Sequence, residues 1–406
     1  MSARRPWAWP LVGVYRAALA VKHALRGEPK RLVWPVVSVG SRSAGGAGKT
    51  PVVIALALLL KERGWGVDVL SRGYGRAGSG VEMVAATVEK QILRSAQDDN
   101  QKSKGNRVAE DAARFGDEPV LIAARADVPV WVGTERYAAG AAAEARALTQ
   151  RKNAEGAKEC AVANPDETQI LRCAQDDKPK GIHLLDDGFQ HRQLARAMDV
   201  VLVTAEDLDD ALLPAGNLRE PLGALARADV VVVREEEIVA ETFKAKVWGL
   251  MREGAQMWVA RRRLVFPNQM KTLGAGLRPV AFCAIARPEN FAEMLLDAGC
   301  GVVETVAFAD HHRYTKADVL RVIEVANGLN ASGFVTTEKD AVKLAPELRK
   351  LLAGVGPLMV VALEVEFVDA EAVVKSIEVA LAASEQQILR DAQDDSAKRI
   401  DSAGGR

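Results

Sequence analysis

The stretch Ser43-Ala-Gly-Gly-Ala-Gly-Lys-Thr50 decides the fold, because it lies between the apolar run Val33 to Val39 and the helical pattern Pro51 to Arg63. Glycines let a backbone approach phosphate groups closely, and the N–H groups of such a loop bind anions together with the N-terminus of the following helix. Ser43 stands where the general pattern has a first Gly. Strand, loop and helix agree, so the stretch predicts a P-loop that binds Mg-ATP.

Each residue of this loop has an expected role. Lys49 is expected to reach the β and γ phosphates, and the Thr50 hydroxyl to bind Mg²⁺. The expected nucleotide-binding residues are Gly45, Gly46, Ala47, Gly48, Lys49 and Thr50.

Strand and helix patterns alternate on both sides of the loop. Further strands are predicted at Val67 to Leu70, Val128 to Val132, Ile182 to Leu185, Val200 to Thr204 and Val230 to Val233, and helices at Arg107 to Phe115 and Arg136 to Leu148. This alternation is typical of an α/β fold, here a P-loop NTPase-like parallel sheet with helices on both faces. The alternation restarts after about residue 245. We therefore expect a P-loop domain at 1–245, a smaller α/β domain at 246–383 that closes the active-site cleft, and a polar, disordered tail at 384–406.

Composition excludes several classes of protein. The chain has 406 residues and 54 basic against 54 acidic side chains, so no overall field steers it to nucleic acid. Its four cysteines form no CxxC pair, which argues against a zinc site or a disulfide framework and indicates a reducing compartment. No run reaches the roughly 20 apolar residues of a membrane-spanning helix.

Residues 1–40 form a strongly basic segment with a single acid, Glu28. On a helical wheel its apolar and basic side chains separate; the apolar stripe consists of Leu11, Val14, Ala18, Val21 and Leu25. Such a helix can lie in an anionic membrane interface. Periodicity alone equally fits a helix packed on its own domain.

One nonapeptide occurs three times, at 91–99, 169–177 and 387–395, and only its fifth position varies. The irregular spacing excludes a solenoid. The first two copies indicate insertions at about 88–106 and 152–180. The Asp-Asp pairs of the three copies resemble catalytic carboxylates but belong to the repeat, and we exclude them.

Asp186 and Asp187 end an apolar strand and precede Gly188. Ligands bind at the carboxyl edge of parallel strands, where a carboxylate can hold Mg²⁺ or its water shell. A turn signal explains the Gly but not the paired acids, so the metal role is favoured. Other polar loops carry little meaning singly: Gly116-Asp-Glu-Pro119 fits a catalytic base or a helix cap, and Asp310-His-His312 fits a metal ligand, a base partner or a solvated loop.

Taken in order, these segments form a recognisable set. They are Gly45 to Pro51, Ser71 to Gly75, Gly116 to Pro119, Asp186 to His191, Leu213 to Pro221, Asp310 to His312 and Thr336 to Asp340. The set resembles the tetraacyldisaccharide 4'-kinase family of lipid A biosynthesis, from the N-terminal helix to about residue 365. That resemblance also makes Ser43 an accepted variant.

The resemblance implies an ATP- and Mg²⁺-dependent kinase that phosphorylates the 4'-hydroxyl of tetraacyldisaccharide 1-phosphate. It implies Asp117 as the general base with His311 tuning or orienting it, and Lys49 on the phosphates. It implies a metal site formed by Thr50, Asp186, Asp187 and Glu220. The substrate contacts that it implies are Arg72, Tyr74, Glu118 and Gln190. It also implies a peripheral protein on the cytoplasmic face of the inner membrane, whose partners are the glycolipid and an anionic membrane surface, with no nucleic acid and no obligate protein partner.

The chain departs from the family pattern at a few positions. Ala284 and Ala286 stand where glycines are usual, Ala309 stands in place of a Pro, and Ser41 in place of an Asn. Two other classes of protein stay open. One is a GTPase or metallochaperone switch, which is disfavoured because Thr337-Glu-Lys-Asp340 is not the Asn-Lys-x-Asp segment that usually selects guanine. The other is a nucleotide-binding module without catalysis, in which Asp117 is dispensable.

Overall fold

The computed structural model describes residues 5–25, 27–74, 76, 78–84, 110–154, 181–266 and 278–403; for 151–154 and 388–403 it describes the backbone alone. The first two copies of the nonapeptide lie outside the described residues. So do the insertions predicted around them, except residues 152–154, which end a helix that begins at Arg136.

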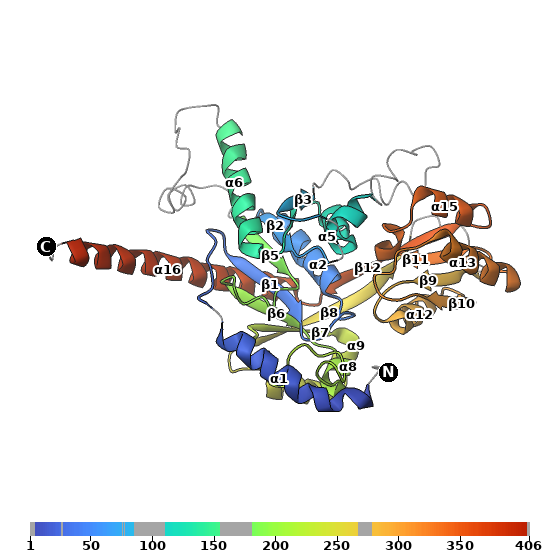
Figure 1. The fold of residues 1–406 in the computed structure, drawn as a ribbon, viewed down its shortest axis with the longest axis horizontal. Helices are drawn as coiled ribbons and strands as arrows, with labels where there is room; N and C mark the ends of the chain where they lie inside the picture. Colours follow the sequence, from blue (N-terminus) through green and yellow to red (C-terminus); the bar gives the residue numbers. More distant parts are fainter. Residues whose placement is uncertain are drawn as a thin grey trace.

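Twelve described strands form one sheet (Figure 1). They are β1 (Val36–Ser41), β2 (Gly66–Ser71), β3 (Glu82–Val84), β4 (Val130–Val132), β5 (Gly181–Asp186), β6 (Met198–Leu202), β7 (Val230–Arg234), β8 (Gln256–Val265), β9 (Val280–Cys283), β10 (Glu304–Ala307), β11 (Phe334–Thr337) and β12 (Leu358–Phe367). Their order is β10-β9-β11-β12-β8-β7-β6-β1-β5-β2-β4-β3. All neighbours are parallel except β8 with β12 and β3 with β4, which confirms the predicted α/β fold with a largely parallel sheet.

Helices cover both faces of the sheet. In the part built on β1 to β7, the P-loop unit, they are α1 (Trp9–Ala24), α2 (Lys49–Glu62), α5 (Asp117–Ala126), α6 (Arg136–Ala154), α8 (Ala205–Asp209), α9 (Glu235–Ile238), α10 (Glu241–Leu250) and the 3₁₀ helices η1 (Pro6–Ala8) and η3 (Leu222–Arg227). In the part built on β9 to β11, the C-terminal unit, they are α12 (Pro288–Asp297), α13 (Lys316–Gly328), α14 (Glu338–Ala341) and α15 (Pro346–Ala353); α16 (Ala370–Ala403) follows β12.

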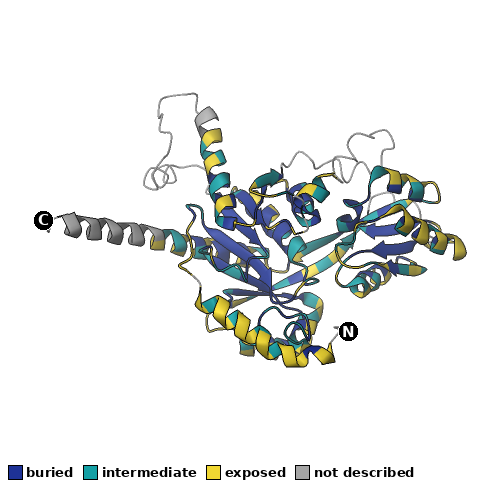
Figure 2. Cartoon of the chain, in the orientation of Figure 1, coloured by how far each residue is buried: buried dark blue, intermediate teal, exposed yellow. Residues whose placement is uncertain are grey.

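Alternation along each strand sorts the core into two layers, because successive side chains point to opposite faces. On β5, Ile182 and Leu184 pack with α2 and α5 on one face, whereas Leu185 packs with α6 on the other. On β7, Val231 and Val233 pack with α10 and η3. Figure 2 shows these strands as the buried centre of the molecule.

The structure divides the chain differently from the sequence-based boundaries. The boundary predicted at 245 falls inside α10, whose Phe243 and Val247 belong to the core of the P-loop unit. Strand β8 pairs with β7 on one side and β12 on the other, so the sheet is continuous between the units. Helix α16 packs Val373 and Ile377 into the core around α2. Hydrophobic periodicity indicates that a face is buried but not which sheet it covers.

Residues 384–403, which belong to the expected disordered tail at 384–406, form the C-terminal part of α16. These residues include the third nonapeptide, which contains neither Gly nor Pro. Its Gln, Leu, Arg and Ala residues favour helix, although its three Asp residues do not. A polar composition therefore did not distinguish helix from coil.

Candidate active site

The P-loop connects β1 to α2 and depends on glycine at three positions. Gly45, Gly46 and Gly48 have φ angles of 89°, 73° and 86°, a left-handed region that costs other residues strain. Gly48 caps α2 without a side-chain hydrogen bond, so the first N–H groups of the helix face the loop for an anion. Ser43 has no positive φ; it is buried and forms an isolated bridge to Leu218. A side chain is therefore accommodated there.

Lys49 lies in a network at the end of β1. Its Nζ lies 3.3 Å from Oδ1 of Asp187 and 3.3 Å from the Ser41 hydroxyl. Arg219 Nη1 contacts the other Asp187 oxygen at 2.7 Å. Burial opposes the charge of Asp187, but Lys49 and Arg219 lower its pKa below the ordinary value. The Asn-to-Ser departure at position 41 thus leaves a hydroxyl that contacts the P-loop lysine.

Asp186 differs from its neighbour. One of its oxygens accepts a hydrogen bond from the Ser71 hydroxyl at 3.0 Å, and the other has no partner among the described residues. Burial, Glu118 and Asp187 raise the pKa of Asp186 to about 7. A buried carboxylate with a free oxygen beside the P-loop fits a cation or its water shell.

The donor set of this edge suits Mg²⁺. Within the described ranges, no three His, Cys, Asp or Glu side chains gather into a group able to hold a metal. Mg²⁺ commonly uses one or two carboxylates together with phosphate oxygens and water. Thr50 and Asp186 fit that arrangement.

Glu220 and Gln190 have other partners. Glu220 is buried and lies 2.8 Å from Arg227 and 3.5 Å from His23, so a metal role requires it to leave both. Gln190 donates to the Ser41 carbonyl at 2.8 Å and accepts from Arg219 at 3.4 Å. The structure thus places Gln190 against the Lys49 network.

Asp117 and His311 meet across the two units. His311 Nδ1 lies 3.1 Å and 3.2 Å from the two oxygens of Asp117. The segment 116–119, interpreted as a loop from sequence, instead begins α5, with Asp117 as its first residue and Gly116 before it at φ 99°. A Pro in the first turn is compatible with a helix start, and the helix N-terminus favours an ionised carboxylate.

The electrostatics of the pair favour an ionised aspartate. Burial opposes it, but the hydrogen bond from His311 and the charge of Lys339 lower the pKa of Asp117. The same hydrogen bond raises the pKa of His311, although burial and Lys339 oppose it.

Two of the expected substrate residues, Tyr74 and Glu118, lie near this pair. Tyr74 is 66% exposed, and its ring lies 5.3 Å from that of His311. Arg72 is exposed two residues before it. Glu118 pairs with Lys339 at 3.3 Å. Exposed groups beside the Asp117–His311 pair leave room for an acceptor.

The loop that follows β9 lies against the P-loop. A Cβ on Gly45 would come within 3.2 Å of the Ala286 side chain and 3.4 Å of Asp310, and one on Gly46 would collide with Arg287. Neither Ala284 nor Ala286 has a positive φ, so these departures are accommodated. Arg287 then reaches Thr204 and Asp207 at 3.3 Å and also contacts Glu206.

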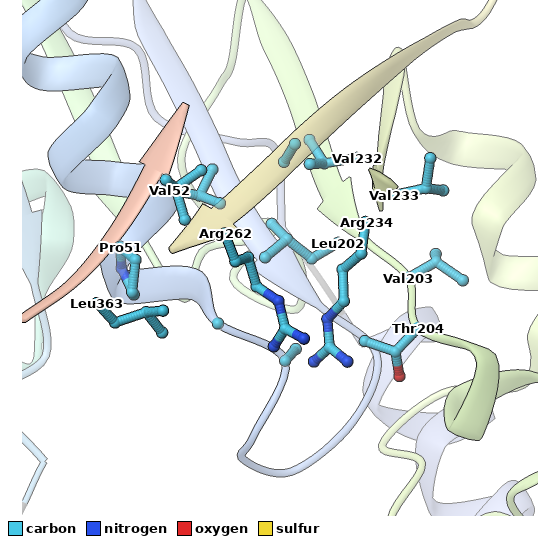
Figure 3. Close-up of a pocket in the computed structure, with 14 residues that line it drawn as sticks. Pro51, Val52, Leu202, Val203, Thr204, Val232, Val233, Arg234, Arg262 and Leu363 are labelled. Carbon is cyan, nitrogen blue, oxygen red and sulfur yellow. The ribbon is translucent and has the colours of Figure 1, made fainter. Parts of the chain in front are cut away.

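A pocket opens beside the P-loop, at the carboxyl ends of β6 and β7 (Figure 3). Val52, Leu202, Val232 and Leu363 supply apolar surface, and Thr204 lies at the same edge. Figure 3 shows the Arg234 and Arg262 side chains extended alongside each other. An apolar pocket with a few polar groups is typical of a small-molecule site.

Comparison with known proteins identifies the family. The model of the tetraacyldisaccharide-1-P 4'-kinase family, LpxK, matches residues 4–382. This chain belongs to that family. The tetraacyldisaccharide 4'-kinase of Koribacter versatilis is 34% identical over 379 residues, 91% of this chain and 97% of that protein. The enzyme of Geobacter metallireducens is 35% identical over 330 residues, 79% and 82%.

A solved LpxK supports the same placement. The structure of the "apo" form of LpxK from Aquifex aeolicus in complex with ATP has a TM-score of 0.60 and 26% identity, and the match covers 92% of this chain and 98% of that one. Membership in the LpxK family confirms the expected kinase activity with Mg-ATP and a lipid A precursor as acceptor.

Sequence reasoning about the LpxK motifs missed three basic residues. Lys339 was part of a quoted motif but received no role. Arg136, at the start of α6, is buried, and the charges of Asp186 and Asp187 act on it. Arg42 is fully buried beneath the P-loop, and no described residue hydrogen-bonds its guanidinium. Only the position of Arg42 next to the P-loop gave a signal; the others depend on long-range contacts.

Proposed function

We propose that Asp117 is the general base of an ATP-dependent transfer to the 4'-hydroxyl of tetraacyldisaccharide 1-phosphate. The observation that supports it is the buried carboxylate of Asp117, held by His311 from the other unit and bordered by the exposed Tyr74. A general base must lie within reach of the proton it takes and be ionised when the acceptor binds. Asp117 meets the second condition through the hydrogen bond from His311 and the charge of Lys339.

Bound Mg-ATP supplies the phosphoryl group and neutralises its developing negative charge. Asp117 takes the proton as the sugar oxygen bonds to the γ phosphorus and the bond from that phosphorus to the bridging oxygen breaks. Lys49 and the N–H groups at the start of α2 hold the phosphates, while Thr50 and Asp186 hold the metal. His311 keeps the Asp117 carboxylate oriented. Such a reaction needs little beyond positioning, charge neutralisation and one base.

The pocket at β6 and β7 is proposed to hold the nucleotide base. It adjoins Gly48 and Pro51, so a nucleotide whose phosphates lie on the P-loop extends toward it. Its apolar walls suit a flat aromatic ring, and Thr204, Arg234 and Arg262 supply polar groups near the ring or ribose.

Helix α1 is proposed to bind the membrane surface from the cytoplasmic face of the inner membrane. The structure contains no described helix that is both long and apolar enough to cross a bilayer. None of the α1 residues is buried, and Trp9, Val14 and Val21 are all more than half exposed. Its polar side instead contacts the active-site loop, through Tyr15 to the Arg219 carbonyl at 2.9 Å and His23 to Glu220. An unpacked apolar stripe favours the membrane interpretation over packing on the protein's own domain.

The kinase activity is tested with vesicles containing tetraacyldisaccharide 1-phosphate, Mg-ATP and the purified chain. We expect a 4'-phosphorylated lipid, detected by phosphate transfer from labelled ATP. GTP turnover without lipid phosphorylation would contradict the proposal.

The membrane role is tested by sedimentation with anionic vesicles that lack the acceptor. We expect Trp7→Ser combined with Trp9→Ser to weaken binding roughly tenfold, because both exposed indoles would enter the interface. Trp248→Ser is the matched control, since Trp248 is also half exposed but lies on α10. Equal binding by the double variant and the wild type would exclude α1 as the membrane contact.

A further inference from the structure

Lys339 places one ammonium among three carboxylates contributed by both units. It is the second residue of α14, just after β11, and its side chain is 19% exposed. Its Nζ lies 3.3 Å from Glu118 Oε1, 3.6 Å from Asp310 Oδ1 and 3.9 Å from Asp117 Oδ2. Burial opposes the charge of Lys339, but the three acids raise its pKa above the ordinary value. The side chain is therefore a permanent cation beside the Asp117–His311 pair.

The same ammonium determines which nitrogen of His311 carries the proton. Lys339 Nζ lies 3.5 Å from His311 Nε2, and an ammonium has hydrogen-bond donors only. The contact is favourable only if Nε2 presents its lone pair, so the ring proton lies on Nδ1. That nitrogen faces Asp117 at 3.1 Å and donates to it.

The other charged groups that face the Asp117–His311 pair act on its protonation in opposite directions. Asp310 Oδ2 lies 3.8 Å from His311 Nε2 and favours a doubly protonated ring. Glu118 adds a second negative charge next to Asp117, and Lys343 adds a more distant positive one. Tyr74 contributes only its ring face. Without Lys339, the carboxylates would dominate and His311 would gain a second proton. The resulting imidazolium lies 3.1 Å from Asp117, closer than the 3.9 Å of Lys339 Nζ, so it would bind the carboxylate more tightly and make Asp117 a weaker base.

We propose that Lys339 is a positioning residue for phosphoryl transfer: its ammonium fixes His311 as the neutral Nδ1–H tautomer and keeps Asp117 ionised and ready to accept a proton. This rests on the proposed role of Asp117 as the general base. It assigns Lys339 a function in the chemistry in addition to joining α14 to α5.

The test compares Lys339→Gln and Lys339→Arg with the full-length wild type in the pH dependence of kcat. We expect the acid limb of the kcat profile of Lys339→Gln to move to higher pH by about one unit. The reason is that the loss of a unit charge at this distance shifts the pKa of a neighbouring group, here His311, by one to three units. Activity should recover partly at alkaline pH. Lys339→Arg retains a positive charge and has only donors, so its limb should stay at the wild-type pH.

A second readout does not depend on activity. The chain has five histidines, so ¹⁵N-histidine NMR can report His311 after assignment with His311→Gln. We expect Nδ1 to stay protonated in both proteins, and Nε2 of the wild type to lose its proton at a lower pH than Nε2 of Lys339→Gln. An unchanged His311 spectrum together with an unchanged acid limb in Lys339→Gln would overturn the proposal. If that variant does not fold, a Lys339→Arg limb displaced by about one unit would overturn it.

Lys343→Gln is the matched control. Lys343 is another buried lysine near α14, paired with Asp340 at 2.9 Å, and it does not contact His311. Its loss should lower the melting temperature without changing the tautomer of His311. Failure of the base itself is distinguishable: if Asp117→Asn keeps its activity, Asp117 is not the base, whereas the NMR comparison still decides whether Lys339 sets the tautomer.

Discussion

The two halves of the cleft are built in different ways. The phosphate side, with Lys49, Asp187 and Arg219, comes entirely from the P-loop unit and the loops at one sheet edge. The acceptor side combines Asp117 from α5 with His311 and Lys339 from the C-terminal unit. The expected phosphate contacts of Lys49 therefore come from one unit, whereas the proposed base is held by residues of both units. This difference predicts which changes separate ATP binding from transfer.

The largest expected effect comes from Asp117→Asn. The amide cannot accept the proton of the sugar hydroxyl, so kcat should fall by about 10² to 10⁴. ATP binding, measured by calorimetry with Mg-ATP, should stay within about twofold, because Asp117 lies outside the P-loop network. A variant that lost ATP binding as well would break the comparison, since the two sides would then not be separable.

A smaller loss of transfer is expected from Lys49→Met, but with weaker binding. Lys49 is expected to contact the phosphates in both the bound state and the transition state, so its loss should reduce kcat by about 10² to 10³ and also raise the dissociation constant of ATP. Calorimetry and steady-state kinetics measure the two effects. Lys61→Met is the control, because Lys61 lies at the other end of α2 and pairs with Asp127. Wild-type ATP affinity in Lys49→Met would contradict the expectation.

An ion-pair bridge between α5 and the C-terminal unit, formed by Arg125, offers a test whose expected effect on kcat is smaller again. Arg125 on α5 contacts Glu338 at 3.2 Å and Glu364 at 2.8 Å, next to Lys339. Arg125→Gln should displace α14 from α5 and reduce kcat about tenfold, since a small misplacement of catalytic groups is costly. ATP affinity should not change. If kcat stays at the wild-type value, contact between the units does not depend on this bridge.

The smallest effect is expected for Asp318, which belongs to the N-terminal capping box of α13 and contacts His312 at 3.0 Å. Hydrogen bonds from Thr315 lower the pKa of Asp318 to about 2, and His312 contributes. A depressed pKa stabilises the fold above the unfolded value of about 3.9 and loses that effect as pH falls toward the folded value. Asp318→Asn should thus cost about 1 kcal/mol at pH 7 and progressively less below pH 4.

Melting temperatures of Asp318→Asn and the wild type at pH 7, 5 and 3 measure this change. Thr315→Ala should give a similar loss at pH 7, because it removes the other half of the cap. Transfer should be unaffected in both. A difference in melting temperature that grows as the pH falls would contradict the sign of the expected effect.

The sequence was most informative where local chemistry suffices. The glycines of the P-loop require a backbone that only glycine adopts easily, and acids at the end of a buried strand mark the ligand edge of a parallel sheet. Residues whose role depends on distant partners were not predictable in this way. Lys339 and Asp117 are more than two hundred positions apart in the chain, and Gly116 to Pro119 gave a turn pattern although it begins a helix.

Pairing across the units was likewise hidden. Strand β8 carries three consecutive arginines, so it lacks the apolar run that marked the other strands, although it is hydrogen-bonded on both sides. The arginines meet glutamates such as Glu235 and Glu364 on neighbouring elements. Charge neutralisation by distant residues made a central strand look like a surface segment.

Helix α16 has a practical consequence for experiments on this enzyme. The last of its side chains in the hydrophobic core is Leu381, and the helix continues to Ala403 toward the side of the molecule opposite the N-terminal end of α1 (Figure 1). At 1.5 Å per residue, that extension projects about 30 Å beyond the body. A biotin or fluorophore attached there would tether single molecules to a surface while leaving both the cleft and α1 accessible.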